Sequence, residues 1–467
     1  MKTLARQALV HFLLAVLILA GCTPVVPKST ATPGTPVATH TTGVTLLPTS
    51  SPSPYPPIGV DPAALRGLTI RAWDAFTGSA DLVYGAQVVH FNAVNEWGIV
   101  VTRTSEGDYP TLFDAVSTAI DSGAGTPDLV AALPEETLAW DHSGAVVDLA
   151  PYVADPVWGL GKGGLNIFPG VFLAQDRGGV RQLGLPAQRS ASFLFYNQTW
   201  AKELGFVHPP ATADEFRQQA CAANASFRTD ANLQNDGYGG WMVDTHWQTI
   251  YSWILAFGGG VVNGDTYTFS TDPNLGAMQF LKGLKDDSCA WLADTTTTTP
   301  LEPLDAFARR LSLFVSGDMA EVPLAGDAMV RQKNNDVWTL IPYPGKTGQV
   351  LVTYGPSYSL LRSTPEKQLA AWLFARWLLS PENQAQWVDA TGLFPLLNSL
   401  PATNPSPQWT SAVADLTLAQ GVPQLASWRK VRYVLEDGAN YIFQTNLRLD
   451  LISAILREMD TTAGEIK

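Results

Sequence analysis

Two glycine-rich stretches have residues that could bind phosphate, because glycine lets backbone N–H groups approach an anion closely. The stretch from Gly159 to Gly164 has the GxGxxG spacing of a dinucleotide site, but that motif must follow a strand and open a helix. Here it follows Pro156-Val157-Trp158 and leads to Pro169, so we interpret it as a surface loop. Gly345-Lys346-Thr347 has the last residues of a P-loop, yet Leu340 stands where its first glycine is required. Neither stretch predicts a nucleotide site.

Patterns for metal binding or nucleophilic catalysis are equally weak. The histidines are far apart in the body and form no HxxxH or HExxH pair. Residues 355–359 lack the second glycine of a nucleophile elbow, and residues 232–237 lack the closing acid of a calcium loop, so we interpret the latter as a polar turn. We therefore expect no metal and no cofactor. A pair of glycosidase carboxylates is recognised only by its separation in space, so the sequence does not decide that point.

The composition excludes several classes of protein. Hydrophobic residues make up 46% of the 467 residues and charged residues only 15%, which is too apolar for a disordered chain. Lys and Arg number 29 against 42 Asp and Glu, so the net charge is −13 and nucleic acid is not an expected partner. The length allows two or three domains.

The N-terminus has the features of an export signal. Lys2 and Arg6 precede an apolar stretch over 8–20, which is short for a membrane span and typical of a secretory signal. Leu19-Ala20-Gly21-Cys22 resembles the bacterial lipobox, which implies a signal peptide over 1–21 and a diacylglyceryl group on Cys22. The alternative is an ordinary signal peptide followed by an incidental cysteine. Two acyl chains suffice for stable membrane anchoring.

Residues 22–66 form a predicted tether. From Thr23 to about Gly59 the chain is rich in Pro, Thr and Ser and nearly uncharged, so it cannot bury enough surface to fold. We therefore expect an extracytoplasmic body that is lipid-anchored to the cell membrane, in a periplasm or at a cell surface. In such an oxidising compartment, Cys221 and Cys289 are expected to form a disulfide, with two buried thiols as the alternative.

The body begins with alternating strand and helix patterns. Strand patterns cover 68–73, 99–102 and 127–132, and helical spacing covers 82–95 and 111–122 between them. This order favours an α/β fold with a parallel sheet and helices on its faces.

Helix signals recur later in the chain. Thr212 and Glu215 form a capping box that predicts a helix start. An aromatic helix is expected over 247–257, and terminal helices are expected over 428–441 and 445–458.

The order of short motifs resembles one known family over residues 67 to 460. The matching stretches are Leu68–Trp73 with Thr77-Gly78, Gly98–Val101, Ser122-Gly123 with Thr126–Val130, Gly144–Tyr152, Leu194–Asn197, Leu204–Phe206, Pro209-Pro210 with Asp214–Phe216, Phe314–Ala320, Ala370–Leu378 and Thr391–Pro395. Their number and order resemble the extracellular solute-binding proteins of ABC importers, family 1, the sugar-binding type related to maltose-binding proteins.

The resemblance implies a two-lobe α/β fold, periplasmic-binding-protein-like and of type II, with a hinge and an interlobe cleft. Lobe 1 would comprise 67–190 and 356–395, and lobe 2 would comprise 191–355 and 396–467. The implied function is to bind a carbohydrate between the lobes, as a monomer, and to deliver it to the transmembrane subunits of an ABC permease. The absence of an aromatic residue after Met319 departs from many relatives and implies either a ligand other than a sugar or a roomier subsite.

Binding residues are expected on loops at the carboxyl ends of strands, where aromatic rings stack on sugar faces and polar groups bond the hydroxyls. By this rule and the resemblance, the candidates are Trp73, Asp74, Phe76, Thr77, Glu135, Ser190, Ser192, Trp247, Tyr354, Gly355, Tyr358 and Phe394. Any of the aromatic residues could instead belong to the core, and Asp74 could be a helix cap.

Other functions remain open at the level of sequence. One is a surface-anchored carbohydrate-active enzyme, and another is a sensor or adhesion module with the same fold but without a permease. Ligands of the glycerol-phosphate type are an alternative to sugars, although no cluster of Arg or Lys marks a phosphate site.

Overall fold

A computed structural model describes residues 55–293, 300–400, 405–444 and 446–466. The predicted signal peptide, Cys22 and the tether up to residue 54 lie outside the described residues. Residues 55–66, the last part of that segment, contact the body: Leu65 is fully buried, and the Ile58 N–H donates to the Asp155 carboxylate at 2.7 Å. Among the helices of the described part, none has both the length and the apolarity that crossing a bilayer requires.

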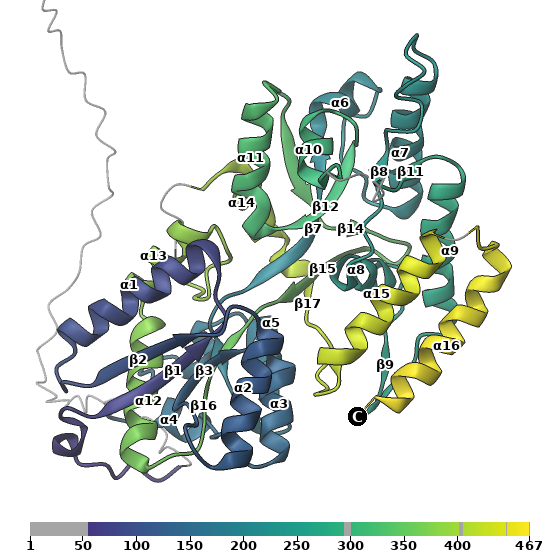
Figure 1. The fold of residues 1–467 in the computed structure, drawn as a ribbon. Coiled ribbons are helices and arrows are strands. Elements are labelled where there is room, and N and C mark those ends of the chain that lie inside the picture. The colour runs from purple at the N-terminus through teal and green to yellow at the C-terminus, as the bar shows by residue number, and fades with distance from the viewer. Residues whose placement is uncertain (1–54, 294–299, 401–404, 445, 467) are drawn as a thin grey trace, which may run out of the picture. The chain divides into compact units, whose positions relative to one another are not determined.

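The first sheet has the strand order β2-β1-β3-β16-β6 (Figure 1). Its strands are β1 (Thr69–Asp74), β2 (Val100–Ser105), β3 (Leu129–Ala132), β6 (Leu185–Pro186) and β16 (Ser357–Leu360). β1 runs parallel to β2 and β3, whereas β16 is antiparallel to β3 and to β6. The expected alternation of strand and helix is confirmed for the first three strands.

Helices cover this sheet, and together they form the unit that we call lobe 1. They are α1 (Gly78–Val94), α2 (Tyr109–Ser122), α3 (Pro134–His142), α4 (Ala150–Ala154), α5 (Gly170–Ala174), α12 (Pro365–Leu378) and α13 (Pro381–Thr391). α2 shows why the local sequence folds in this way. The Asp108 side chain accepts a hydrogen bond from the Thr111 N–H, and Gly123 ends the helix in a left-handed conformation. Leu112 and Val116 face the core.

The second sheet has the order β11-β8-β12-β7-β15-β14, with β13 paired to β7 and β17 paired to β15. Its strands are β7 (Ser190–Asn197), β8 (Trp241–Met242), β11 (Ala290–Trp291), β12 (Phe314–Asp318), β13 (Trp338–Ile341), β14 (Tyr343–Pro344), β15 (Gln349–Tyr354) and β17 (Ala419–Gln420). All eight residues of β7 are buried, as expected for a central strand.

The helices on the second sheet complete lobe 2. They are α6 (Gln198–Glu203), α7 (Ala213–Arg228), α8 (Trp247–Ala256), α9 (Asp272–Asp286), α10 (Pro303–Ala308), α11 (Val322–Arg331), α14 (Pro407–Ala414), α15 (Trp428–Gln444) and α16 (Ile452–Glu465). The capping box of Thr212 and Glu215 is confirmed at the start of α7. The last helix was expected over 445–458 but begins at Ile452, because its buried residues Ile452, Leu456, Met459 and Ala463 extend to the end of the chain.

Three segments carry the chain between the two lobes. Residues 187–189 lead from β6 to β7, residues 355–356 lead from β15 to β16, and the segment after Gly392 leads from α13 to α14. We call these segments the first, second and third crossings.

The glycine-rich stretches are loops, as expected. Residues 159–163 form a loop before a short 3-10 helix (Gly164–Ile167), and Lys346 and Thr347 form the bend between β14 and β15.

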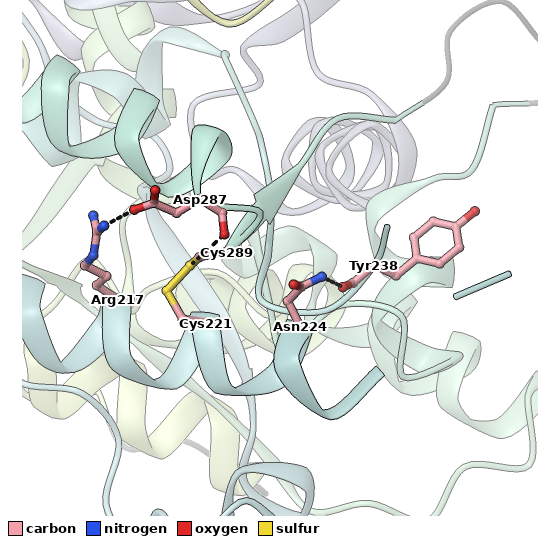
Figure 2. The surroundings of a disulfide bond; sticks show 6 residues. All are labelled: Arg217, Cys221, Asn224, Tyr238, Asp287 and Cys289. Atoms are coloured by element: carbon pink, nitrogen blue, oxygen red, sulfur yellow. Dashed lines mark hydrogen bonds and ion pairs between the residues drawn. A yellow bond between two sulfur atoms is a disulfide. The ribbon is translucent and has the colours of Figure 1, made fainter. Parts of the chain in front are cut away.

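A disulfide bond joins Cys221 on α7 to Cys289, which precedes β11 (Figure 2). The two cysteines are therefore bonded, as expected, and are not two free thiols. Arg217 and Asp287 form an ion pair beside the disulfide, and the Asn224 amide donates to the Tyr238 carbonyl at 2.7 Å (Figure 2). The bond lies wholly within lobe 2.

Candidate functional site

Two adjoining cavities lie at the ends of strands and the starts of helices. The first, of about 230 Å³, is lined by Tyr109, Leu133, Pro134, Glu135, Trp247, Gln248, Tyr354, Gly355, Val422, Arg432 and Tyr433. The second, of about 200 Å³, is lined by Ser192, Asp244, His246, Gln248, Thr249, Pro303, Ser316, Gly317, Asp318, Glu321 and Tyr354. Because Gln248 and Tyr354 line both, we treat the two cavities as one cleft. Residues of both lobes line the first cavity.

Aromatic rings form one wall of the cleft. Trp247 is the first residue of α8, and its ring lies edge-to-face with Tyr354, with centroids 5.7 Å apart. The Arg432 guanidinium lies 5.8 Å from the centroid of the Trp247 ring and 5.2 Å from that of the Tyr433 ring. Such rings offer flat apolar faces beside a charged hydrogen-bond donor.

An ion pair crosses the cleft between the lobes. The Arg432 guanidinium on α15 donates to the Glu135 carboxylate on α3 at 2.8 Å, and both residues are buried. Burial raises the pKa of Glu135, and the charge of Arg432 acts in the opposite direction. The neighbouring Glu136 carboxylate accepts a hydrogen bond from the Leu133 N–H at 3.0 Å, which fixes the start of α3.

Three carboxylates line the second cavity. The Tyr354 hydroxyl donates to Asp318 at 3.1 Å, and burial raises the pKa of Asp318. Burial and the charge of Asp318 raise the pKa of Glu321 to about 7. Asp244 accepts a hydrogen bond from the His246 ring at 2.5 Å, which raises the pKa of His246 to about 9. The cavity is therefore lined by carboxyl groups, which accept hydrogen bonds when ionised and can also donate one when protonated.

Neutral polar groups complete the cleft. The Ser192 hydroxyl lies 3.0 Å from the Tyr343 hydroxyl, and the Gln248 Oε1 atom is buried without a hydrogen-bond partner among the described residues. Aromatic faces, carboxylates, an arginine and an amide can together hold an uncharged ligand that carries many hydroxyl groups. No group of three or more His, Cys, Asp or Glu side chains suited to a metal ion occurs in the described part of the chain.

The structure brings five of the twelve sequence-predicted residues to the cleft: Glu135, Ser192, Trp247, Tyr354 and Gly355. The residues that follow β1 do not line it. Asp74 is fully buried and accepts hydrogen bonds from Arg103 Nε and Nη2, each at 2.7 Å. Phe76 packs edge-to-face against Tyr84, with centroids 5.0 Å apart.

The remaining predicted residues lie elsewhere. Thr77 is exposed before α1, and Trp73 is half-buried near the core of lobe 1. The Tyr358 and Phe394 rings are buried, the first near Tyr84 and the second between Phe172 and Phe193. Ser190 pairs with Tyr354 in the β7–β15 ladder and lines neither cavity.

Sequence reasoning missed several residues of the cleft. They are Tyr109, Asp244, His246, Gln248, Asp318, Glu321, Arg432 and Tyr433. Asp244 and His246 lie in the loop between β8 and α8, so the rule that binding residues follow the carboxyl ends of strands selects them once β8 is known. Arg432 lies in the second turn of α15, and no local pattern marks it.

A larger cavity of about 560 Å³ lies between α11, α13 and α14. Its lining is mainly apolar and includes Val322, Pro323, Trp338, Val388 and Trp409. It contains no Lys or Arg among the described residues that line it.

Two lobes with a polar, aromatic-lined cleft between them are the arrangement typical of a solute-binding protein. The chain belongs to the bacterial extracellular solute-binding protein family, whose model matches residues 86–417. No curated protein matches the sequence.

Solved structures share the two-lobe periplasmic-binding-protein-like fold at low sequence identity. The sugar-binding protein MalE of Xanthomonas citri has a TM-score of 0.70 and 18% identity, over 85% of this chain and 96% of that chain. The cyclic α-maltosyl-1,6-maltose binding protein of Arthrobacter globiformis has a TM-score of 0.67 and 17% identity, over 85% and 98%. UgpB of Mycobacterium tuberculosis, solved with glycerophosphocholine, has a TM-score of 0.67 and 14% identity, over the same shares of the chains.

Proposed function

We propose that this protein is the substrate-binding component of an ABC importer and that it binds a carbohydrate in the cleft between its lobes. The observation that carries the proposal is the first cavity, in which Trp247 and Tyr354 lie beside the Glu135–Arg432 pair. Rings of this kind stack on the C–H faces of sugars, while the charged pair and Gln248 bond the hydroxyls. The sugar-binding proteins of similar fold support this ligand class.

We propose a neutral sugar rather than a phosphate-bearing ligand. Arg432 is the only Lys or Arg among the described residues that line the cleft, and its charge is already paired with Glu135. In the second cavity, His246 is paired with Asp244, and the Asp318 and Glu321 carboxyl groups repel a phosphate group in their ionised form. The likeness to UgpB therefore supports the fold and does not change the proposed ligand.

We propose that the protein is not an enzyme. One feature favours the alternative of a carbohydrate-active enzyme: Glu321, with a pKa of about 7, lies beside Asp318 in the second cavity. However, the Glu321 carboxylate accepts the Asp318 N–H at 2.9 Å and so caps the short helix that follows β12. We interpret this pair as a structural cap.

We further propose that the chain is exported, lipidated on Cys22 and held at the outer side of the cell membrane, where it works as a monomer and delivers its ligand to the permease subunits. The proposed lobes are 67–190 with 356–395 and 191–355 with 396–467. Mass spectrometry of the mature N-terminus tests the anchor, because a diacylglyceryl group on Cys22 is expected and an unmodified residue would refute it. In cells, a Cys22→Ala variant is expected to be released from the membrane fraction.

A thermal-shift screen of the full-length chain tests the ligand. The panel comprises mono- and oligosaccharides, polyols and glycerol phosphates. A ligand at about 1,000 times its Kd stabilises the folded state by roughly 4 kcal/mol, which gives a clear rise in Tm. A shift with one sugar class, and no new product after incubation, is the expected result. Conversion of the sugar would favour the enzyme, and a response only to glycerol phosphates would refute the neutral-sugar proposal.

A further inference from the structure

Arg189 lies where the three crossings between the lobes meet. It belongs to the first crossing, and its side chain is fully buried. Its Nη1 group donates to the carbonyl oxygens of Gly355 at 3.0 Å and Pro356 at 2.6 Å, which form the second crossing. Its own carbonyl accepts a hydrogen bond from the Phe394 N–H of the third crossing at 3.2 Å. One residue is thus hydrogen-bonded to both other crossings.

The same guanidinium is anchored to lobe 1. Its Nη2 group donates to both carboxylate oxygens of Asp176 at 3.0 Å, to the Ser357 hydroxyl at 2.9 Å and to the Phe172 carbonyl at 3.3 Å. Asp176 is buried as well, so the pair is desolvated on both sides. The cost of removing both charges from water offsets much of their attraction. We therefore look for the role of the pair in the geometry that it fixes and not in the stability of the fold.

The backbone around Arg189 holds the first two crossings close together. The N–H groups of Ala187 and Gln188 both donate to the Pro356 carbonyl, at 3.0 and 3.3 Å. Gly355 has a φ of +145°, and a Cβ atom there would lie 2.5 Å from the Gln188 oxygen, so the two crossings touch. Directly beyond them, Ser190 and Tyr354 pair in the sheet of lobe 2.

We propose that Arg189 is the positioning residue for lobe closure. Its hydrogen bonds hold the first and second crossings against lobe 1. In these two crossings, the rotation of lobe 2 relative to lobe 1 is therefore confined to the bonds between residues 189 and 190 and between residues 354 and 355, which we call the pivot. Tyr354 and Gly355 also line the ligand cleft, so the pivot directly adjoins the ligand. The inference concerns the motion of the lobes and does not depend on which ligand the cleft takes.

Lysine cannot replace Arg189 in this role, although it keeps the positive charge beside Asp176. The planar guanidinium presents a rigid fork of donors, whereas an ammonium group on a flexible stem cannot bond Asp176, Ser357 and two carbonyls in fixed directions. Arg189→Lys therefore keeps the positive charge and removes the fixed geometry of the hydrogen bonds. A matched control is Arg103→Lys, because Arg103 also pairs with a fully buried carboxylate, that of Asp74, but lies within lobe 1.

The test measures the distance between the lobes in the ligand-free, full-length chain. Spin labels are placed at the exposed positions Ala93 on α1 and Ala225 on α7, as Ala93→Cys and Ala225→Cys in a Cys22→Ser background. Electron–electron resonance gives the distribution of the distance, and thermal unfolding gives Tm. Arg189→Lys is expected to widen the distribution or shift its mean, whereas Arg103→Lys is expected to lower Tm without either change.

An unchanged distribution in Arg189→Lys, with a Tm loss like that of Arg103→Lys, would overturn the proposal, since the residue would then be merely structural. If Arg189→Lys does not fold, Ser357→Ala takes its place, because it removes a single partner of the guanidinium. A smaller widening is then expected, and an unchanged distribution counts against the role of Arg189. Because no ligand is present, a failure of the sugar screen leaves this result unaffected.

Discussion

The carboxylate of Glu135 and the guanidinium of Arg432 lie 2.8 Å apart and join α3 of lobe 1 to α15 of lobe 2. A second arginine reinforces this contact, because the Arg429 guanidinium lies 4.0 Å from the centroid of the Phe113 ring on α2. α15 is thus held against two helices of the other lobe. Since Glu135 and Arg432 also line the first cavity, the proposed ligand site and the contact between the lobes share these side chains.

Removing one member of the pair is expected to destabilise the protein. Arg432→Gln leaves the Glu135 carboxylate buried without a counter-charge, which should lower the free energy of unfolding by about 3–5 kcal/mol. Urea denaturation measures this loss. The double variant Glu135→Gln with Arg432→Gln should recover part of the loss, as a double-mutant cycle would show. Additive losses would mean that the two residues do not interact in solution.

Trp247 is expected to contribute strongly to ligand binding. Trp247→Ala removes the ring beside Tyr354 and should weaken binding of the most stabilising sugar of the screen by about 2 kcal/mol, or roughly 30-fold in Kd. Isothermal titration calorimetry measures the change. Trp97→Ala is the control, because Trp97 packs near Trp158 and lines neither cavity of the cleft. Equal weakening by both variants would contradict a direct role for Trp247.

Asp74 is expected to stabilise lobe 1 rather than bind ligand. Asp74→Asn leaves Arg103 without its buried partner and should lower the free energy of unfolding by about 3 kcal/mol, with little change in sugar Kd. Chemical denaturation and calorimetry on the same variant give the two quantities. Loss of sugar binding at an unchanged free energy of unfolding would instead mean that Asp74 belongs to the ligand site.

The sequence predicted the fold better than the site. The first strands of lobe 1 follow from the local spacing of apolar residues, and the start of α7 follows from its capping box. Both signals lie within a few residues of the chain. Trp247 could be selected from the resemblance, because it belongs to an aromatic helical stretch that precedes three glycines, Gly258 to Gly260. Arg432 could not be selected, because its partner Glu135 is distant in sequence and only tertiary packing brings them together.

The rule that sites follow strands also selects residues that serve packing. Phe76 and Phe394 both occur after strands or crossings, but their rings fill the core, which sequence spacing alone does not distinguish from a cleft wall.

The disulfide is expected to contribute substantially to the stability of lobe 2. The bond joins residues that are 68 positions apart, and a closed loop of that length restricts the unfolded chain by about 4 kcal/mol. The variant Cys221→Ala with Cys289→Ala should lose about this much in urea denaturation. Reduction of the wild-type protein with dithiothreitol should reproduce the loss, and an unchanged midpoint in both cases would contradict it.

Stability is expected to depend on pH through Glu321. Burial and the charge of Asp318 raise its pKa from 4.5 to about 7, so the folded protein binds more protons than the unfolded chain between these values. Its contribution to stability therefore falls as the pH rises across that window. Glu321→Gln should make the free energy of unfolding, measured in urea over the window, decline less steeply. Glu458→Gln, on the exposed side of α16, is the control for the loss of one carboxylate.

The crossings have a consequence for the order in which the chain can fold. In the lobe 1 sheet, β3 pairs with β16, and Ala131 lies opposite Tyr358. A chain emerging from the ribosome exposes the open edge of β3 until all of lobe 2 as far as β15 has been synthesised. The lobe 1 sheet therefore cannot be completed before β16 has been synthesised, although β1, β2 and β3 all lie in the first third of the polypeptide.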